Sequence, residues 1–301
     1  MLQRLTAPRF LAYLLALLVA LNLSVEFANL NGRRGLFLAD GNLPVGRDFA
    51  VFFAAGDIVA EGDGAALYSL DRQQQELSRL LERDEFFLPF AYPAFVALPY
   101  ALLSRLPYLW AYALGTAVMF GAFVAAVHML RQGSLSARDH TGFLLLGLFA
   151  YSPVTWATFG GLNGAFSLLC LAGAYASLVS GRAGSAGLWL GCLLFKPQLA
   201  GPLLLLLLWR RQWRTVATAV VVGLVLSVAG ALATKPTWPV DLAVLTSSDR
   251  YLDPERECCG RLHSSLVGVV SWWLGGNDWP TILISTAVGA VTVALTIYAW
   301  R

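Results

Sequence analysis

The chain has 301 residues, of which 57% are hydrophobic and only 13% are charged, and its mean hydropathy is +0.64. Soluble domains usually carry about 25% charged residues, so this composition indicates a polytopic membrane protein. The net charge of +3 is too small to indicate a nucleic-acid-binding protein. The four cysteines lack the spacing of a metal site, and we assign them neither a disulfide nor zinc.

Apolar segments of about the 20 residues that a spanning helix needs recur along the chain. The first follows "MLQRLTAPRF" without a clear small-residue cleavage site, so we expect an uncleaved first span. The segment 86–104 is the weakest, because three prolines interrupt it. The candidate spans are about 10–30, 86–104, 107–130, 141–159, 163–180, 184–208, 215–234 and 281–300. The sequence therefore predicts an all-α polytopic integral membrane protein with about 8 transmembrane helices, forming a single domain over residues 1–301.

Two longer polar stretches, 31–85 and 235–280, interrupt the apolar series, and loops of this length are usually functional. Lys and Arg are enriched in cytoplasmic flanks, and a cytoplasmic N-terminus with all segments crossing puts more arginines inside than outside. Those inside would be Arg4, Arg9, Arg105, Arg210, Arg211, Arg214 and Arg301, and those outside would be Arg131, Arg138 and Arg182. This topology puts both loops on the external face, whereas a re-entrant 86–104 would put the basic turn 209–214 outside.

The first loop contains the Phe-rich stretch "VGRDFAVFFAAGDIV", residues 45–59. If it is helical, its phenylalanines cluster on one side, as in an interfacial amphipathic helix. Nine residues at about 100° each turn Asp57 away from Asp48, so the two are not a carboxylate pair on one helix face. Asp48 is a candidate catalytic carboxylate or a simple N-cap. Asp57 is a solvated residue or one that orients a substrate.

Lys196 lies within the apolar run 184–208 and is followed by Pro197 and Gln198. A charged group at such a position is costly and is a candidate functional group. Of the 21 basic residues only Lys196 and Lys235 are lysines, which favours a role for a compact cation, such as contact with a phosphate oxygen. Snorkelling to an interface or an ion pair with another helix remains the alternative.

Other candidates lie at breaks in the apolar pattern. Tyr92 in "FAYPAF" and Asn163 in "SPVTWATFGGLNG" could line a cavity, although such motifs also simply end helices. In the second loop, "DRYLDPERECCGRLHSSLVGV" carries Arg250, Arg261 and His263. No P-loop, Rossmann fingerprint, HExxH or GxSxG motif occurs, so ATP coupling, dinucleotide chemistry and the common hydrolase arrangements have no support.

Several of these stretches occur in an order that resembles glycosyltransferase family 87. They are "RDFAVFFAAGDIVAEGDGAALY", "FAYPAFVALPYALL", "GGLNGAFSLL", "GLWLGCLLFKPQLAGPLLLLLLWRRQWR" and "LHSSLVGVV", which together cover about residues 45–270. The resemblance implies a GT-C-like integral membrane enzyme that takes mannose or arabinofuranose from a polyprenyl-phosphate donor, with inversion. It implies an acceptor that is a glycolipid or an envelope glycan, no nucleotide sugar, no cofactor and usually no metal.

The resemblance also assigns roles to residues. The catalytic carboxylate of the first external loop corresponds to Asp48, which would act as general base on the acceptor hydroxyl. Lys196 would stabilise the charge that grows on the leaving phosphate, with Arg250, Arg261 and His263 as further candidates. Asp57, Tyr92, Asn163 and Gln198 would line the substrate cavity. The expected location is the cell membrane with an external active site.

Two other functions remain compatible with the sequence. A lipid or sugar transporter or flippase would also need an intramembrane lysine, broken helices and external loops. An inactive scaffold for envelope assembly would keep the fold without the chemistry. Sugar transfer by the wild-type chain, lost on Asp48→Asn, separates the enzyme from both alternatives.

Overall fold

The computed structural model describes residues 7–39, 41–84, 86–132, 140–248, 283–284 and 286–291. Within these residues the ordered elements are helices, and the only extended pairings are two isolated β-bridges in the loop after the first helix. The prediction of an all-α protein is therefore confirmed for the described part. The chain divides into two units, Met1–Thr246 and Ser247–Arg301, and the elements below belong to the first.

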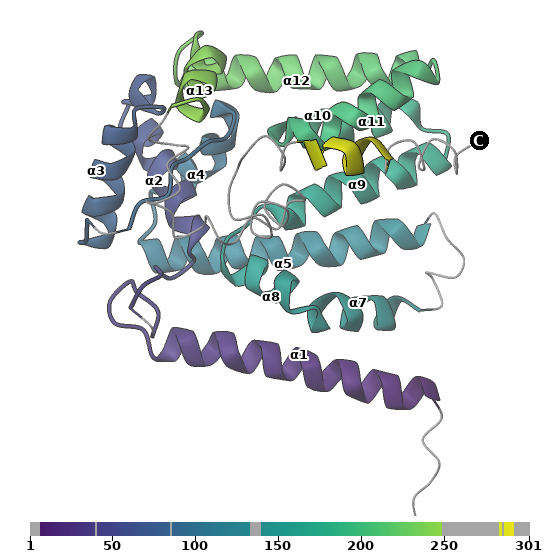
Figure 1. Cartoon of the computed structure of the whole chain (residues 1–301), viewed down its shortest axis with the longest axis horizontal. Helices are drawn as coiled ribbons and strands as arrows, with labels where there is room; N and C mark the ends of the chain where they lie inside the picture. Colours follow the sequence, from purple (N-terminus) through teal and green to yellow (C-terminus); the bar gives the residue numbers. More distant parts are fainter. Residues whose placement is uncertain are drawn as a thin grey trace, which may run out of the picture. The chain divides into compact units, whose positions relative to one another are not determined.

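In the described part of the chain, three helices are long and apolar enough to cross a membrane: α1 (Ala7–Asn31), α5 (Tyr108–Gln132) and α12 (Trp213–Ala233). Their axes lie roughly parallel in Figure 1, and α5 runs opposite to α1 and α12. A fourth candidate consists of α7 (Thr141–Ala150) and α8 (Ser152–Phe159), which meet at a bend of 73°. The bend follows from the Ser152–Pro153 start of α8, because proline cannot continue the preceding helix. These helices support the prediction that the chain is a membrane protein.

The remaining apolar segments form shorter helices. They are α9 (Gly164–Val179), α10 (Ala183–Cys192), the 3₁₀ turn η3 (Leu193–Phe195) and α11 (Pro197–Trp209). The run 184–208, predicted as one span, thus breaks at Lys196, and Pro197 begins the new helix. By length and composition the described residues hold three spans, or up to 4 with the bent pair, against the about 8 expected from roughly 20-residue segments.

α10 lies directly against α12, and glycines make the close approach possible. A Cβ atom added at Gly187 would lie 2.4 Å from the Thr215 carbonyl oxygen, and one added at Gly191 would lie 2.5 Å from the Val222 Cβ. Both residue numbers rise together, so α10 and α12 run in the same direction. α9 returns beside α10, where the Gly173 backbone leaves room for the Trp189 ring.

A second group of helices gathers at one end of the long ones (Figure 1): α2 (Asp48–Ala60), α3 (Leu70–Leu81), α4 (Ala97–Leu103) and α13 (Trp238–Thr246). Two 3₁₀ turns, η1 (Gly64–Ala66) and η2 (Ala94–Val96), connect them. We call this end the loop end. α4 is too short to cross a membrane, so the predicted span 86–104 forms part of this group instead.

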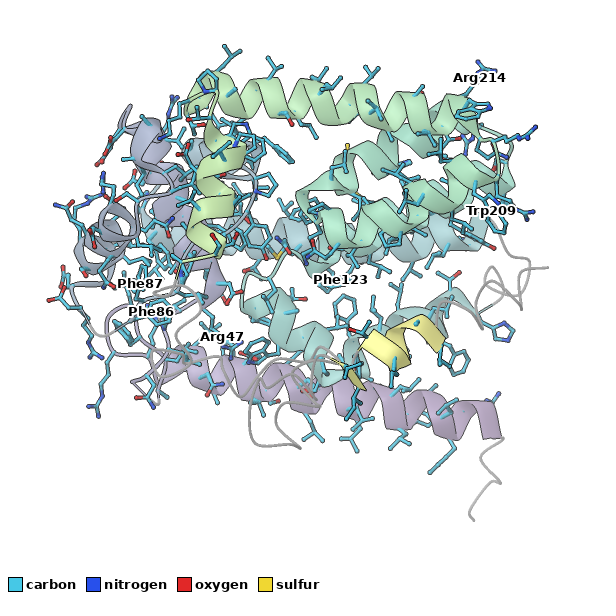
Figure 2. The ribbon with its side chains drawn as sticks, turned by 45° about the horizontal axis from the view of Figure 1, so that its top comes forward. Arg47, Phe86, Phe87, Phe123, Trp209 and Arg214 are labelled. Atoms are coloured by element: carbon cyan, nitrogen blue, oxygen red, sulfur yellow. The ribbon has the colours of Figure 1, made fainter. Side chains whose placement is uncertain are left out.

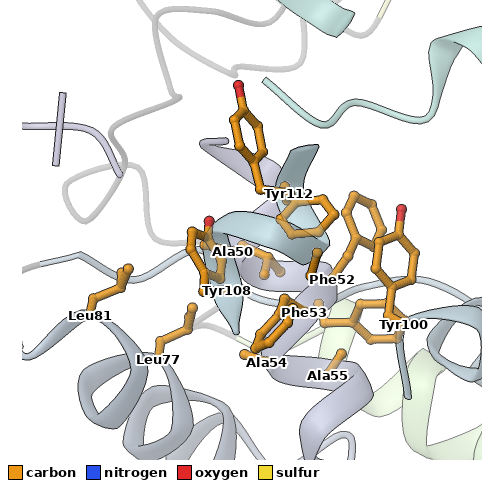
Figure 3. Close-up of a cluster of buried hydrophobic side chains, with 14 of the residues drawn as sticks. Ala50, Phe52, Phe53, Ala54, Ala55, Leu77, Leu81, Tyr100, Tyr108 and Tyr112 are labelled. Atoms are coloured by element: carbon orange, nitrogen blue, oxygen red, sulfur yellow. The ribbon is translucent and has the colours of Figure 1, made fainter. Parts of the chain in front are cut away.

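α2 is the centre of the loop end. Nearly every side chain from Phe49 to Ile58 is buried, so the helix is enclosed by protein on all sides. Figure 3 shows Phe52 and Phe53 between Tyr100 on one side and Tyr108 and Leu77 on the other. The prediction of an interfacial amphipathic helix was therefore wrong. Apolar residues occur on every face of α2, and they pack against α3, α4 and α5 rather than against lipid. The amphipathic helix of this loop is α3.

The described start of the second loop contacts the first loop. A Cβ atom added at Gly64 of η1 would lie 2.1 Å from the Ala233 carbonyl oxygen, at the end of α12. Trp238 on α13 belongs to the same buried cluster as Phe52, and its indole N–H donates to the Ser227 carbonyl. Residues 31–85 and the beginning of 235–280 therefore share the loop end.

The opposite end of the long helices carries the basic turn between α11 and α12, and we call it the turn end. Figure 2 shows Trp209 and Arg214 there, far from Phe86 and Phe87. Arg105 belongs to the loop end, because it precedes Tyr108, whose hydroxyl donates to the Val45 carbonyl.

Two further arginines lie at the turn end: Arg131 closes α5, and Arg182 lies in the turn that leads into α10. The expectation that all eight segments cross had assigned Arg105, Arg131 and Arg182 to the opposite sides. That assignment was wrong because several segments turn back part of the way along the long helices.

Candidate active site

Asp48 is the first residue of α2, at the point where the chain enters the buried core. The N-cap position is taken by Arg47, which has φ 45° and forms no capping bond, so the N-cap interpretation of Asp48 was wrong. The Asp48 side chain is half-buried and makes no hydrogen bond or ion pair with the described residues. Burial raises the pKa of Asp48 to about 6, although the positive charges of Arg47 and Lys196 oppose the rise. An unengaged carboxylate with such a pKa is suited to accept a proton near neutral pH.

The pH dependence of activity follows from this pKa. A general base works only when it is ionised, so we expect kcat/KM to be full above pH 6 and to fall about tenfold per pH unit below it. Measured kcat/KM from pH 4.5 to 8 should have its midpoint near 6, where the raised pKa lies. A midpoint near the ordinary Asp value of about 3.9 would contradict the assignment.

Arg47 is held by a buried ion pair that the sequence analysis missed. Its guanidinium lies 3.3 Å from the Glu26 carboxylate on α1, and the side chains of Arg47 and Glu26 are only 8% and 9% exposed. The same group donates to the Trp156 carbonyl and lies 4.8 Å from the Trp156 ring centroid. The signal was present in the sequence, since Glu26 is an acidic residue inside the first apolar span. The pair joins α1 to the start of α2 and so supports the position of Asp48.

The turn between α8 and α9 packs against the same point. The Phe49 amide donates to the Gly160 carbonyl at 3.3 Å. Gly161 has φ +71°, and a Cβ atom there would lie 2.4 Å from the Phe49 Cβ, so only glycine fits. Asn163 follows as the residue before α9; it is 4% exposed, and among the described residues neither its amide oxygen nor its amide nitrogen has a hydrogen-bond partner.

Lys196 lies where the apolar run 184–208 breaks, between η3 and α11. Its side chain is half-buried, makes no ion pair with the described residues, and places Nζ 5.9 Å from the Phe195 ring centroid. Its charge lies within electrostatic reach of Asp48. The structure thus brings together two groups that are 148 positions apart in the sequence, and the broken helix gives Lys196 the mid-helix opening that it needs.

The aromatic candidates lie in the wall beside Asp48. The Tyr92 ring packs 5.1 Å from the ring centroid of Phe52, and its carbonyl accepts a hydrogen bond from Tyr68. Tyr100 on α4 was not predicted; its ring stacks on Phe52, and its hydroxyl lies within electrostatic reach of Asp48. Gln198, the second residue of α11, has an exposed side chain.

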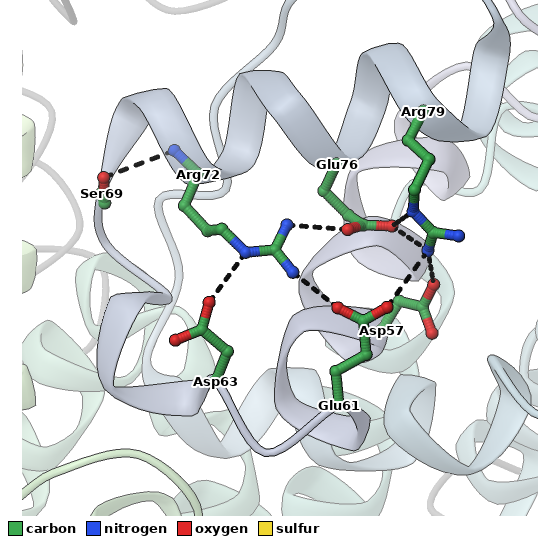
Figure 4. A network of polar contacts seen from close by, with 7 residues as sticks. All are labelled: Asp57, Glu61, Asp63, Ser69, Arg72, Glu76 and Arg79. Carbon is green, nitrogen blue, oxygen red and sulfur yellow. Dashed lines mark hydrogen bonds and ion pairs between the residues drawn. The ribbon is translucent and has the colours of Figure 1, made fainter.

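Asp57 belongs to a separate network on the far side of α2 (Figure 4). It pairs with Arg79 at 2.5 Å, and Arg79 also pairs with Glu76. Burial and the neighbouring Glu76 charge raise the pKa of Asp57. For Glu76 burial acts in the same direction, but hydrogen bonds from Arg79 and Arg72 outweigh it and lower its pKa. The structure does not bring Asp57 to Asp48, and its contacts hold α3 on α2.

The same network holds the carboxylates that come closest to a metal site in the described residues. One oxygen from each of Asp57, Glu61 and Glu76 lies within 4.8 Å of the others. Arg72 and Arg79 already bridge these oxygens, and each arginine contacts two or more of the acids. The arrangement therefore serves as an ion-pair network between α2 and α3. Arg250, Arg261 and His263 lie outside the described residues.

An apolar cavity of about 530 Å³ lies between α1, α5 and the α7–α8 pair. Leu23, Phe120 and Phe149 line its apolar wall, and Tyr112 lines it toward the site. The Tyr112 ring also packs on Gly46, next to Arg47. Tyr112 therefore lies both in the wall of this cavity and against the residues that precede α2.

Taken together, these elements define an integral-membrane protein with an unengaged acid at the start of α2 and, within its electrostatic reach, a cation at a helix break. The chain belongs to glycosyltransferase family 87, whose family model matches residues 90–301. The recognition made from the sequence is thereby confirmed, and the class of activity is glycosyl transfer. The match includes Asn163 and Lys196 but begins after Asp48. Neither a curated protein nor a solved structure matches the chain.

Proposed function

We propose that this protein is an inverting glycosyltransferase that takes mannose or arabinofuranose from a polyprenyl-phosphate donor. The acceptor is a hydroxyl of a glycolipid or an envelope glycan. The proposal is carried by the juxtaposition of Asp48 and Lys196 in a chain of family 87. One group can take a proton and the other can stabilise a leaving phosphate, which are the two tasks of this reaction.

In the proposed reaction the Asp48 carboxylate removes the proton of the acceptor hydroxyl. The acceptor oxygen bonds to the anomeric carbon while the bond from that carbon to the phosphate oxygen breaks. The polyprenyl phosphate leaves with the electron pair, and Lys196 stabilises the negative charge that develops on it. A single displacement from the opposite face inverts the anomeric centre. The chain's own residues supply both functions, and the expected reaction needs no cofactor or metal.

A lipid-borne donor fits the surroundings of Asp48. The apolar cavity beside Tyr112 is lined by side chains from membrane-type helices and suits a hydrocarbon chain. The basic turn end carries Arg9, Arg131, Arg182 and the turn 209–214, which favours the cytoplasm for that end. The loop end, with Asp48, then faces the exterior of the cell membrane, where lipid-linked sugars replace nucleotide sugars.

The proposal is tested by a transfer assay with the purified full chain in lipid nanodiscs. Radiolabelled polyprenyl-phosphate mannose and polyprenyl-phosphate arabinose are supplied separately with a glycolipid extract, and a nucleotide sugar serves as the third arm. We expect transfer from one lipid-linked donor and none from the nucleotide sugar. Transfer from the nucleotide sugar would contradict the donor class. In sealed vesicles, movement of the donor across the membrane without any transfer would favour a flippase.

A further inference from the structure

The N-terminal end of α9 carries unused hydrogen-bond donors inside the protein. α9 has 16 residues and no acidic residue in its first turn. Its first intrahelical bond runs from the Ser167 amide to the Asn163 carbonyl, and the amides of Gly164, Ala165 and Phe166 donate to no atom in the described part of the chain. Such an end presents free N–H groups and the positive pole of the helix dipole, which attract anions.

The Asn163 side chain is a second and independent sign of a ligand. Both of its polar atoms are buried without a partner, although an asparagine before a helix normally accepts from the second or third amide. The helix end and the side chain that could cap it are therefore both unsatisfied. Buried polar groups are rarely left this way unless a ligand or water completes them. Asn163 directly precedes the first turn of α9, whose backbone amides are free within the described part of the chain.

The position of this helix end is set by Asp48 and its neighbours. The Gly160–Gly161 turn is held on the Phe49 backbone, so α9 begins beside the start of α2. Next to the end, a Cβ atom added at Gly164 would meet no atom within 4 Å, so there is space at the first turn. The charge of Lys196 lies within electrostatic reach of Asp48, at the start of the same α2.

We propose that the N-terminal end of α9 and the Asn163 amide form a binding site for a phosphate group. The inference rests on the proposed function for its ligand, the phosphate of the polyprenyl donor and of the released polyprenyl phosphate. The backbone amides and the Asn163 N–H₂ group donate to phosphate oxygens, while Lys196 supplies the charge. Asn163 thereby acts in phosphate binding rather than in helix capping.

The test measures binding of a polyprenyl monophosphate to the full chain in detergent, followed by tryptophan fluorescence. A neutral polyprenol of the same length and inorganic phosphate are the comparison ligands. Asn163→Asp keeps the shape and places a carboxylate at the helix end, where it suits the helix dipole, so the fold is retained. Asn163→Ser also keeps a capping residue. Gln212→Glu adds the same charge at the exposed turn end as a control.

We expect the wild type and Gln212→Glu to bind polyprenyl monophosphate alike and to bind the polyprenol more weakly. Asn163→Asp should weaken phosphate binding at least about tenfold, the loss expected for a charge-assisted hydrogen bond replaced by repulsion. Unchanged affinity in Asn163→Asp would overturn the phosphate site, even where sugar transfer is intact. If Asn163→Asp weakens the binding of inorganic phosphate and the wild-type chain transfers no lipid-linked sugar, the anion site stands. The assignment of its ligand to the polyprenyl donor is then overturned instead.

Discussion

Asp48→Asn is expected to lower kcat at least about 10²-fold and up to about 10⁴-fold, the range for loss of a general base. The amide has nearly the shape of the carboxylate but cannot take a proton from the acceptor hydroxyl. Because Asp48 makes no hydrogen bond or ion pair with the described residues, the change breaks no contact that holds α2. Transfer of radiolabelled sugar at saturating donor measures the effect.

The matched control for this change is Asp84→Asn in the same loop. Asp84 is exposed and lies beyond α3, so the same chemical change there should leave transfer at the wild-type level. Thermal unfolding of both variants should match the wild type. Equal transfer by Asp48→Asn and Asp84→Asn would remove Asp48 from the mechanism.

Glu26→Gln is expected to destabilise the protein by about 3–5 kcal/mol, because it leaves the buried Arg47 cation without its partner. Arg47 is 7% exposed and has a left-handed backbone conformation immediately before Asp48. Loss of its partner should therefore also disturb the entry into α2 and reduce transfer. The free energy of unfolding in mixed detergent micelles measures the first effect.

A double change and an exposed arginine complete this experiment. Glu26→Leu with Arg47→Leu removes both charges, so it should be more stable than Glu26→Gln. Arg34→Gln lies on the exposed surface and should shift stability by less than about 1 kcal/mol. If Glu26→Gln unfolds like the wild type, the pair does not hold α1 to α2.

Asp48 and Lys196 could be singled out from the sequence because each is a charged residue in an apolar stretch. An acid at the start of a Phe-rich stretch and a lysine within an apolar run both carry a cost that a function can explain. Their proximity could not be predicted, since it depends on how the start of α2 and the break at Lys196 pack in the folded chain. Pro197 signalled the break at Lys196, but apolar length was given more weight.

Asn163 and Glu26 illustrate two different limits of prediction from the sequence. Asn163 was a candidate because it lies at a break in the apolar pattern, and its lack of partners among the described residues became apparent only from packing. Glu26 is recognisable in the sequence as an acidic residue inside the first apolar span, but its partner Arg47 is 21 positions away, at the start of another helix. A sequence pattern predicts which residues avoid water, but it does not specify which distant group will neutralise a charge.

The sequence by itself determined that the protein is helical and membrane-embedded, and it led to the correct family, because apolar periods and ordered motifs are local properties. Tertiary structure alone decided that α2 is enclosed by protein instead of lying on lipid. A helix that is apolar on all sides can bury its surface either in lipid or in a protein core. The choice depends on which helices pack around it, here α3, α4 and α5.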